Sequence, residues 1–172
     1  MPAVGLCNRL GSARRGAQRD EEEIVASDRI ASFVAALPIR PDMRILEIGC
    51  GPGVAARLIA ARLESGIIVA IDRSARAVEQ ACAGSVAEIA SGRMEVRQSA
   101  IEDFELQKGE AGFDLIFGMR IGVLDGRHPQ LQEKALGQIA VAARSGARLF
   151  IDGGDPLEEI ILTGGKQAVL RG

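Results

Sequence analysis

Arg44-Ile45-Leu46-Glu47-Ile48-Gly49-Cys50-Gly51-Pro52-Gly53 is the stretch that decides the fold, because an apolar strand runs there directly into a glycine turn. A second apolar segment, Ile67 to Ile71, follows about twenty residues later and ends at Asp72. Small residues let backbone amides approach a ligand closely, and an acid at the tip of the next strand can accept hydrogen bonds from two ribose hydroxyls. The two segments together predict a nucleoside-binding site.

Further strands alternate with helices along the chain, at spacings that favour an α/β fold. Helical periodicity predicts helices from the acidic run at 20–23 to Pro38, from the glycine turn to near Gly66, from Ser74 onward, and over 131–144. Apolar runs predict further strands at 94–97, 113–117 and 148–151. The alternation implies one domain over residues 20–172 with a doubly wound, mostly parallel sheet, whose ligands bind beyond the carboxyl ends of the strands.

The C-terminal segment predicts a shortened β-hairpin. Ile160 to Thr163 and Gln167 to Leu170 flank the turn residues Gly164-Gly165-Lys166. A hairpin at the edge of a sheet leaves backbone groups unpaired, so the edge either stays solvated or pairs with a second copy. A homodimer is therefore one expected state.

Composition limits the function classes. The net charge of −2 gives no general attraction to nucleic acid, and no segment approaches the roughly 18 consecutive apolar residues of a membrane span. Three cysteines without metal-ligand spacing indicate neither a disulfide framework nor a metal site, so a cytoplasmic protein is expected. Residues 1–19 carry four arginines and no acid, and we interpret them as a mobile basic N-terminal arm.

The glycine spacing alone does not identify the nucleoside. Residues 51–56 fit the loose G-x-G-x-x-A pattern of dinucleotide folds, which place a pyrophosphate at the next helix N-terminus. Glu47 lies two residues before the first glycine, where a carboxylate would repel a pyrophosphate but tolerate a cation. We therefore expect a cationic ligand without phosphates and retain an NAD-dependent oxidoreductase as a less favoured alternative.

The string Leu46 to Gly53 resembles the first motif of class I S-adenosylmethionine-dependent methyltransferases, and the resemblance extends over roughly residues 20 to 155. It implies a Rossmann-like methyltransferase sheet, S-adenosylmethionine as cofactor and S-adenosylhomocysteine as product. It also implies methyl transfer to a small-molecule acceptor by in-line displacement. A non-catalytic nucleotide-binding or regulatory module with the same fold remains the main alternative.

The resemblance also implies roles for individual residues. Glu47 would reach the cofactor's ammonium group, and Asp72 would bind the ribose. Ser99 stands where the family usually has an acid, and it would contact the adenine amine either alone or with the nearby Glu102. The remaining implied cofactor contacts are Gly49, Cys50, Gly51 and Gly53 in the glycine loop, Arg73, Ala100 and Ile101 near the adenine, and Gly118 and Met119 at the amino-acid end.

The loop after the fourth strand gathers charged residues within ten positions. Arg120 and Arg127 would select an anionic or acidic substrate, and Asp125 or His128 could accept a proton from the nucleophile. Asp152, after the fifth strand, is a separate candidate for substrate contact. A solvated surface loop is the alternative interpretation of this cluster.

Overall fold

The structure is a computed structural model that describes residues 27–124, 126–163 and 167–170. Two features expected from the sequence, the basic arm at residues 1–19 and the candidate proton acceptor Asp125, lie outside these residues.

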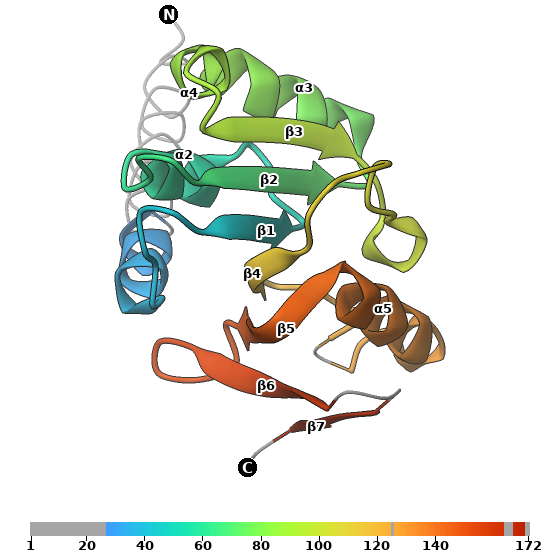
Figure 1. Ribbon diagram of the computed structural model, residues 1–172. Helices are drawn as coiled ribbons and strands as arrows, with labels where there is room; N and C mark the ends of the chain where they lie inside the picture. Colours follow the sequence, from blue (N-terminus) through green and yellow to red (C-terminus); the bar gives the residue numbers. More distant parts are fainter. Residues whose placement is uncertain (1–26, 125, 164–166, 171–172) are drawn as a thin grey trace, which may run out of the picture.

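The strands form one seven-stranded sheet within the described residues, in the order β3-β2-β1-β4-β5-β6-β7 (Figure 1). The first five strands of this order pair in parallel, whereas β6 and β7 pair antiparallel. The doubly wound, mostly parallel sheet and its C-terminal hairpin are thus confirmed. The strands are β1 Arg44–Ile48, β2 Ile67–Asp72, β3 Met94–Gln98, β4 Phe113–Gly118, β5 Ala143–Ile151, β6 Glu158–Thr163 and β7 Gln167–Leu170.

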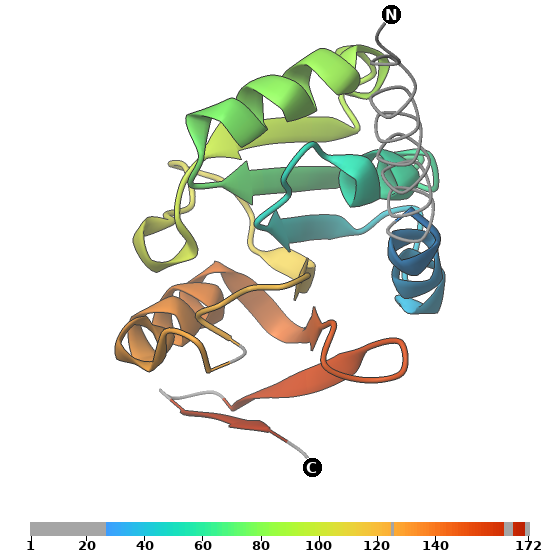
Figure 2. The ribbon, with the colours of Figure 1, turned by 180° about the vertical axis from the view of Figure 1, so that it is seen from behind.

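Helices cover both faces of the sheet. The helix over residues 27–36 lies with α2 and α3 on one face, and α5 lies on the other (Figures 1 and 2). Ser74 caps α3 as expected, because its hydroxyl accepts a hydrogen bond from the Ala77 amide at 3.4 Å. The helices that follow the one at 27–36 are α2 Val54–Ala60, α3 Ala75–Gly84, α4 Val86–Ala90, the 3₁₀ turn η1 Ile101–Asp103 and α5 Pro129–Ala142.

The periodicity predicted that the helix after the glycine turn continues to near Gly66. This prediction is wrong, because α2 ends at Ala60. The amides of Glu64 and Gly66 both donate to the carbonyl of Pro41 at 2.9 Å. The segment after Ala60 therefore bonds to the loop before β1, and this tertiary pairing replaces the last helical turns.

Side-chain alternation along β1 divides its residues between two cores. Ile45 belongs to the core beneath α2 and the helix at 27–36, whereas Leu46 and Ile48 belong to the core beneath α5. Successive strand residues point to opposite faces, so Glu47 falls on the α2 side with Ile45. This places a carboxyl group inside an otherwise apolar layer, at the carboxyl end of the strand.

The hairpin ends the sheet. Within the described residues, β7 pairs only with β6 and is the last strand in the order. An edge strand with an unpaired outer side is compatible with a second copy adding to the sheet. The homodimer stays a prediction.

An ion-pair network anchors the segment between β3 and β4. Arg97 donates to both oxygens of Glu95 at 2.6 and 2.9 Å and to both oxygens of Glu110 at 3.0 and 2.7 Å. Arg44 donates to Glu110 as well, and the Gln107 amide donates to it at 2.7 Å. Hydrogen bonding to Arg97 is the main cause that holds the pKa of Glu110 below its usual value.

We expect Glu110→Ala to lower the free energy of unfolding by about 2 kcal/mol at pH 7, because two partly buried arginines lose their shared acceptor. Urea denaturation measures this effect, with the exposed Glu105→Ala as the matched control. A carboxyl group whose pKa is lowered by folding stabilises the protein at pH values above its ordinary pKa of 4.5. This contribution is lost as the pH falls through the folded pKa. A loss that persists undiminished at pH 3 would contradict the assignment to the ion pairs.

Candidate functional site

The sheet reverses its strand order between β1 and β4, and this reversal sets the position of the site. The chain builds β2 and β3 on one side of β1 and then places β4 on the other side. The last residues of β1 and β4, Ile48 and Gly118, are register partners. Ligands of open α/β sheets bind in the crevice beyond such a reversal. Three adjoining cavities lie along this edge of the structure.

Backbone hydrogen bonds hold the glycine loop after β1 against β2. The amides of Gly49 and Cys50 both donate to the Ile71 carbonyl, at 2.8 and 3.0 Å. Gly51 has a φ of 52°, and a Cβ built on it would meet nothing within 4 Å. Glycine is required there by the left-handed backbone and not by crowding. The open side of Gly51 leaves room for a ligand to approach the main chain.

Asp72 joins the glycine loop to the end of β2. One of its carboxylate oxygens accepts from the Gly51 amide at 3.0 Å, and the other accepts from the Ser74 amide at 2.9 Å. These two bonds fix the orientation of the carboxylate, and each oxygen keeps a further lone pair for a ligand hydroxyl.

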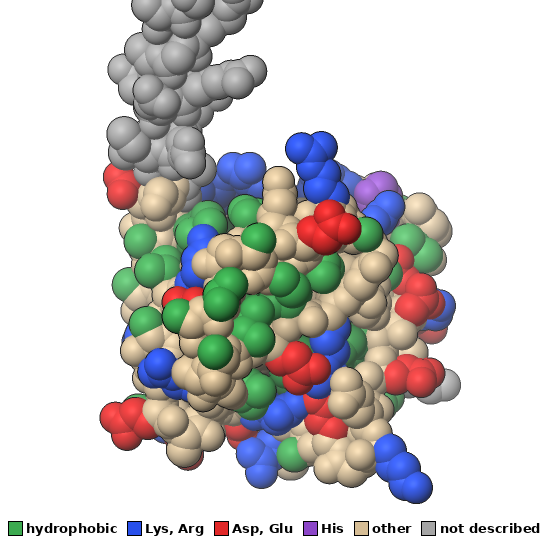
Figure 3. Space-filling view, turned by 90° about the horizontal axis from the view of Figure 1, so that it is seen from above, with side chains coloured by type: hydrophobic (Ala, Val, Ile, Leu, Met, Phe, Trp, Pro, Cys, Tyr) green, Lys and Arg blue, Asp and Glu red, His purple; other side chains and the backbone are tan. Residues whose placement is uncertain are grey.

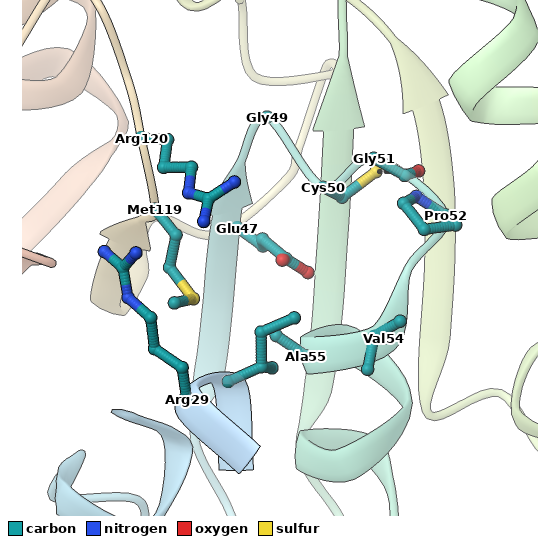
Figure 4. A pocket seen from close by; sticks show the side chains of 11 residues that line it. Arg29, Glu47, Gly49, Cys50, Gly51, Pro52, Val54, Ala55, Met119 and Arg120 are labelled. Atoms are coloured by element: carbon teal, nitrogen blue, oxygen red, sulfur yellow. Dashed lines mark hydrogen bonds between the residues drawn. The ribbon is translucent and has the colours of Figure 1, made fainter. Parts of the chain in front are cut away.

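The first of the three cavities, which we call the glycine-loop cavity, has a volume of about 290 Å³. Figure 4 shows Glu47 extending from β1 between the glycine loop and α2, with Arg29 and Arg120 at the opposite side. The cavity is lined by Arg29, Ile30, Glu47, Gly49, Cys50, Gly51, Pro52, Val54, Ala55, Met119 and Arg120.

Glu47 is the unusual group of this cavity. Its side chain is buried, with the residue only 5% exposed, and its Oε2 atom has no hydrogen-bond partner among the described residues. Burial raises the pKa of Glu47 to about 8, and the charge of Asp72 adds to the rise, while a backbone hydrogen bond from Ala56 and the charge of Arg57 oppose it. At neutral pH the isolated protein therefore holds a proton on Glu47. A cation that enters the cavity would favour the ionised form and displace this proton.

Cys50 in the same loop has the properties of a packing residue. Burial, reinforced by Glu47 and Asp72, raises the pKa of its thiol to about 12. The thiol therefore stays protonated at neutral pH, which supports a packing role and disfavours a nucleophile.

The second cavity, the Asp72 cavity, has a volume of about 220 Å³. The Ser99 hydroxyl donates to the Ala100 carbonyl at 2.9 Å, so its proton is engaged and its lone pairs can accept from a ligand amine. His128, the residue before α5, also lies here, and its amide donates to the Gly122 carbonyl at 2.9 Å. The cavity is lined by Ile48, Gly49, Asp72, Arg73, Ser99, Ala100, Ile101, Glu102, Ile121, Gly122, Val123, Arg127 and His128.

The third cavity, the Asp152 cavity, lies beyond the ends of β4 and β5 and has a volume of about 220 Å³. Asp152 accepts from the Arg29 guanidinium at 2.6 Å and from the Arg120 amide at 2.8 Å. The Arg127 guanidinium donates to the Arg120 carbonyl at 2.7 Å. The cavity is lined by Arg120, Ile121, Leu124, Arg127, Ile151, Asp152 and Gly153.

The structure brings together most of the residues that the sequence singled out, although Gly53 and Gly118 line none of the three cavities. Gly53 is the N-cap residue before α2 and has a φ of 75°, and a Cβ at Gly118 would lie 2.5 Å from the side chain of Ile121. His128 lies with Asp72 and Ser99, and does not line the Asp152 cavity.

Arg29 and Ile30 are cavity residues that the sequence analysis missed. Both lie near the start of the helix over 27–36, which packs on the α2 face of the sheet, and both line the glycine-loop cavity. An apolar residue at helical spacing such as Ile30 indicates a core position, and an exposed helical arginine such as Arg29 carries no local signal of a role.

Three observations on the described residues concern other kinds of site. Lysine and arginine side chains are interspersed with acidic ones on the face shown in Figure 3. None of the helices in the described part of the chain has the length and apolar character needed to cross a membrane. Among the same residues, His, Cys, Asp and Glu side chains form no cluster of three or more suited to a metal ion.

Comparison with known proteins adds a family and a fold. A family model described as a methyltransferase domain matches residues 39–167, more than half of the chain. Coclaurine N-methyltransferase, solved with N-methylheliamine and SAH, has a TM-score of 0.58 and 21% identity over 77% of this chain and 36% of that chain. A search among curated proteins finds no match.

Two further solved structures have similar folds. A TehB-like SAM-dependent methyltransferase from Corynebacterium glutamicum has a TM-score of 0.53 and 21% identity, over 82% of this chain and 72% of that chain. The [4+2]-cyclase SpnF has a TM-score of 0.59 and 22% identity, over 72% of this chain and 43% of that chain. Such identities show the fold alone, and the chain spans less than half the length of coclaurine N-methyltransferase and of SpnF.

Proposed function

The chain belongs to the methyltransferase domain family, and from this premise we propose that it binds S-adenosylmethionine and catalyses methyl transfer to a small-molecule acceptor. The observation that carries the proposal is the buried, unpartnered carboxyl oxygen of Glu47 beside the glycine loop. Such a group is costly in a folded protein unless a ligand completes its interactions. A positively charged amino group is the ligand that it fits.

The acceptor groups of the glycine-loop cavity and of the Asp72 cavity fit the two ends of this cofactor. Glu47 would hold the ammonium group in the glycine-loop cavity, where Met119 supplies apolar contact. Asp72 would accept hydrogen bonds from the ribose hydroxyls, and Ser99 from the adenine amine. The remaining proposed contacts are Gly49, Cys50, Gly51 and Gly53 in the loop, Arg73, Ala100 and Ile101 near the adenine, and Gly118 at the end of β4.

S-adenosylmethionine, when bound, supplies a methyl group on a positively charged sulfur, which is already activated for transfer to a nucleophile. The residues of this chain would then contribute orientation and the exclusion of water. The three cavities adjoin each other along one edge of the sheet, so an acceptor in the Asp152 cavity would lie next to the glycine-loop cavity. Asp125 and His128 remain candidate proton acceptors.

The test is calorimetric titration of the protein with S-adenosylhomocysteine and, in parallel, with NAD. We expect S-adenosylhomocysteine to bind with micromolar affinity or better and NAD to bind at least about 100-fold more weakly, because only the ammonium group of the former can pair with the buried carboxyl group of Glu47. Comparable affinities for the two ligands would overturn the assignment.

Catalysis is tested separately from binding. A screen of small metabolites for incorporation of a labelled methyl group should yield an acceptor whose turnover disappears in Asp72→Ala. Tight binding of S-adenosylhomocysteine with no turnover of any acceptor would favour the non-catalytic module.

A further inference from the structure

Arg120 lies on the wall that the glycine-loop cavity and the Asp152 cavity share. Its side chain is exposed, and Figure 4 shows it extending from the end of β4 toward the glycine-loop cavity. Its guanidinium has no hydrogen-bond or ion-pair partner within the residues that the structure describes. An unpaired guanidinium at the mouth of a cavity presents a planar fork of donors, which matches a carboxylate or another oxyanion.

The backbone of Arg120 is held in a conformation that arginine rarely adopts. Its φ of 57° is left-handed, and it is the only non-glycine residue with a positive φ among the described residues. Both of its backbone polar groups are tied down, since the amide donates to Asp152 and the carbonyl accepts from Arg127. Strain that the surrounding structure maintains at the edge of a cavity points to a function for the strained residue.

Asp152 does not cancel the charge of Arg120. Its carboxylate forms an ion pair with Arg29 and is only 13% exposed, so its negative charge is already neutralised. Glu158 lies near Gly153, but its side chain is not part of the cavity wall. The rest of the wall is partly aliphatic, with Ile121, Leu124 and Ile151. The Asp152 cavity therefore combines one unpaired cation with an apolar lining.

We propose that the Asp152 cavity binds an anionic group of the methyl acceptor and that Arg120 is the residue that recognises it. This inference rests on the proposed function. The acceptor class is a small organic acid, since a volume of about 220 Å³ is below the roughly 300 to 1,000 Å³ of cavities that hold drug-sized ligands. Asp152 acts as a positioning residue that fixes the Arg120 backbone and leaves the guanidinium free.

The experiment measures binding of benzoate and hexanoate, with benzamide and hexanamide as neutral matched ligands, by calorimetry or ligand-observed NMR. Each titration is made with and without saturating S-adenosylhomocysteine. For the wild-type protein we expect the acids to bind about tenfold more tightly than the amides, or better, because a charge-assisted bidentate pair forms only with the acid.

Arg120→Gln and Arg120→Gly should both abolish this preference for acids. The glycine variant adopts a positive φ without strain, so its thermal midpoint should equal or exceed that of the wild type, and a loss of binding there cannot be a loss of folding. The matched control is Arg40→Gln, which removes an exposed guanidinium that pairs with Asp42 at 3.5 Å and lines none of the three cavities. Arg40→Gln should keep the full preference.

Three results would overturn the proposal. Equal binding of acids and amides to the wild type removes the anion site, and a preference that survives in both Arg120 variants assigns it to another residue. A loss confined to S-adenosylhomocysteine affinity would mean that Arg120 binds the carboxylate of the cofactor and not that of an acceptor.

If S-adenosylhomocysteine fails to bind while the acid preference remains, the proposed function is wrong and the Asp152 cavity serves another activity.

Discussion

Glu47→Gln is expected to stabilise the protein and at the same time to remove most of its affinity for S-adenosylhomocysteine. The carboxyl group of Glu47 has a folded pKa of about 8 against an ordinary value of 4.5. The folded state therefore keeps a proton that the unfolded state releases, and the stability of the wild type falls as the pH rises from 4.5 to 8. Glutamine carries no such proton, so the variant should gain about 2 to 5 kcal/mol at pH 8 and almost nothing at pH 4.5.

The binding half of this prediction has the opposite sign. A neutral amide cannot pair with the ammonium group, so S-adenosylhomocysteine should bind about 100-fold more weakly to Glu47→Gln. The 5′-methylthio analogue of adenosine, which lacks the amino-acid end, should bind both proteins equally. For the wild type, calorimetry in buffers of different ionisation enthalpy should show one proton released per S-adenosylhomocysteine bound at pH 7.

The matched control for Glu47 is Glu64→Gln, an exposed glutamate in the turn after α2. Its urea midpoint should follow that of the wild type between pH 5 and pH 8 within error. Two results would contradict the assignment: a Glu47→Gln protein with unchanged affinity for S-adenosylhomocysteine, or one whose stability advantage does not grow with pH.

The second large effect is expected for Asp72→Ala. Its carboxylate accepts from the Gly51 and Ser74 amides, so the substitution loosens the glycine loop as well as removing the proposed ribose acceptor. The two losses together should weaken S-adenosylhomocysteine binding by about 100-fold or more. Asparagine is not a conservative rescue, because its NH₂ group would face one of the two backbone amides.

Two ligands separate ribose recognition from general damage to the loop. Wild-type protein should bind adenosine more tightly than 2′,3′-dideoxyadenosine, and Asp72→Ala should bind them equally. Asp42→Ala, which removes an exposed carboxylate from the loop before β1, should keep the wild-type discrimination. If Asp72→Ala still prefers adenosine, another residue holds the ribose.

The five expected strands of the parallel sheet and the C-terminal hairpin were predictable because they depend on local pattern. The run Phe113 to Phe117 is apolar except at Asp114, and a strand covered on both faces buries such a run. The predicted end of α2 was wrong because the true end depends on a partner distant in sequence. Helix α2 stops at Ala60 because Pro41, which lies before β1, accepts the amides that a longer helix would have used.

The sequence was sufficient to predict that Glu47, the glycines at 49 and 51, and Asp72 lie together, because a strand end and a left-handed turn each require a particular residue type at a particular spacing. The nucleoside site that they form stays a prediction. Sequence could not give the ionisation state of Glu47. A charged carboxylate would repel a pyrophosphate, whereas burial under α2 leaves Glu47 protonated at neutral pH. Arg29, Arg120 and Asp152 likewise meet only in the tertiary structure, since they come from three elements and their roles depend on a 2.6 Å ion pair and a 2.8 Å amide contact. Desolvation and long-range pairing are properties of the packed chain, and local sequence does not encode either of them.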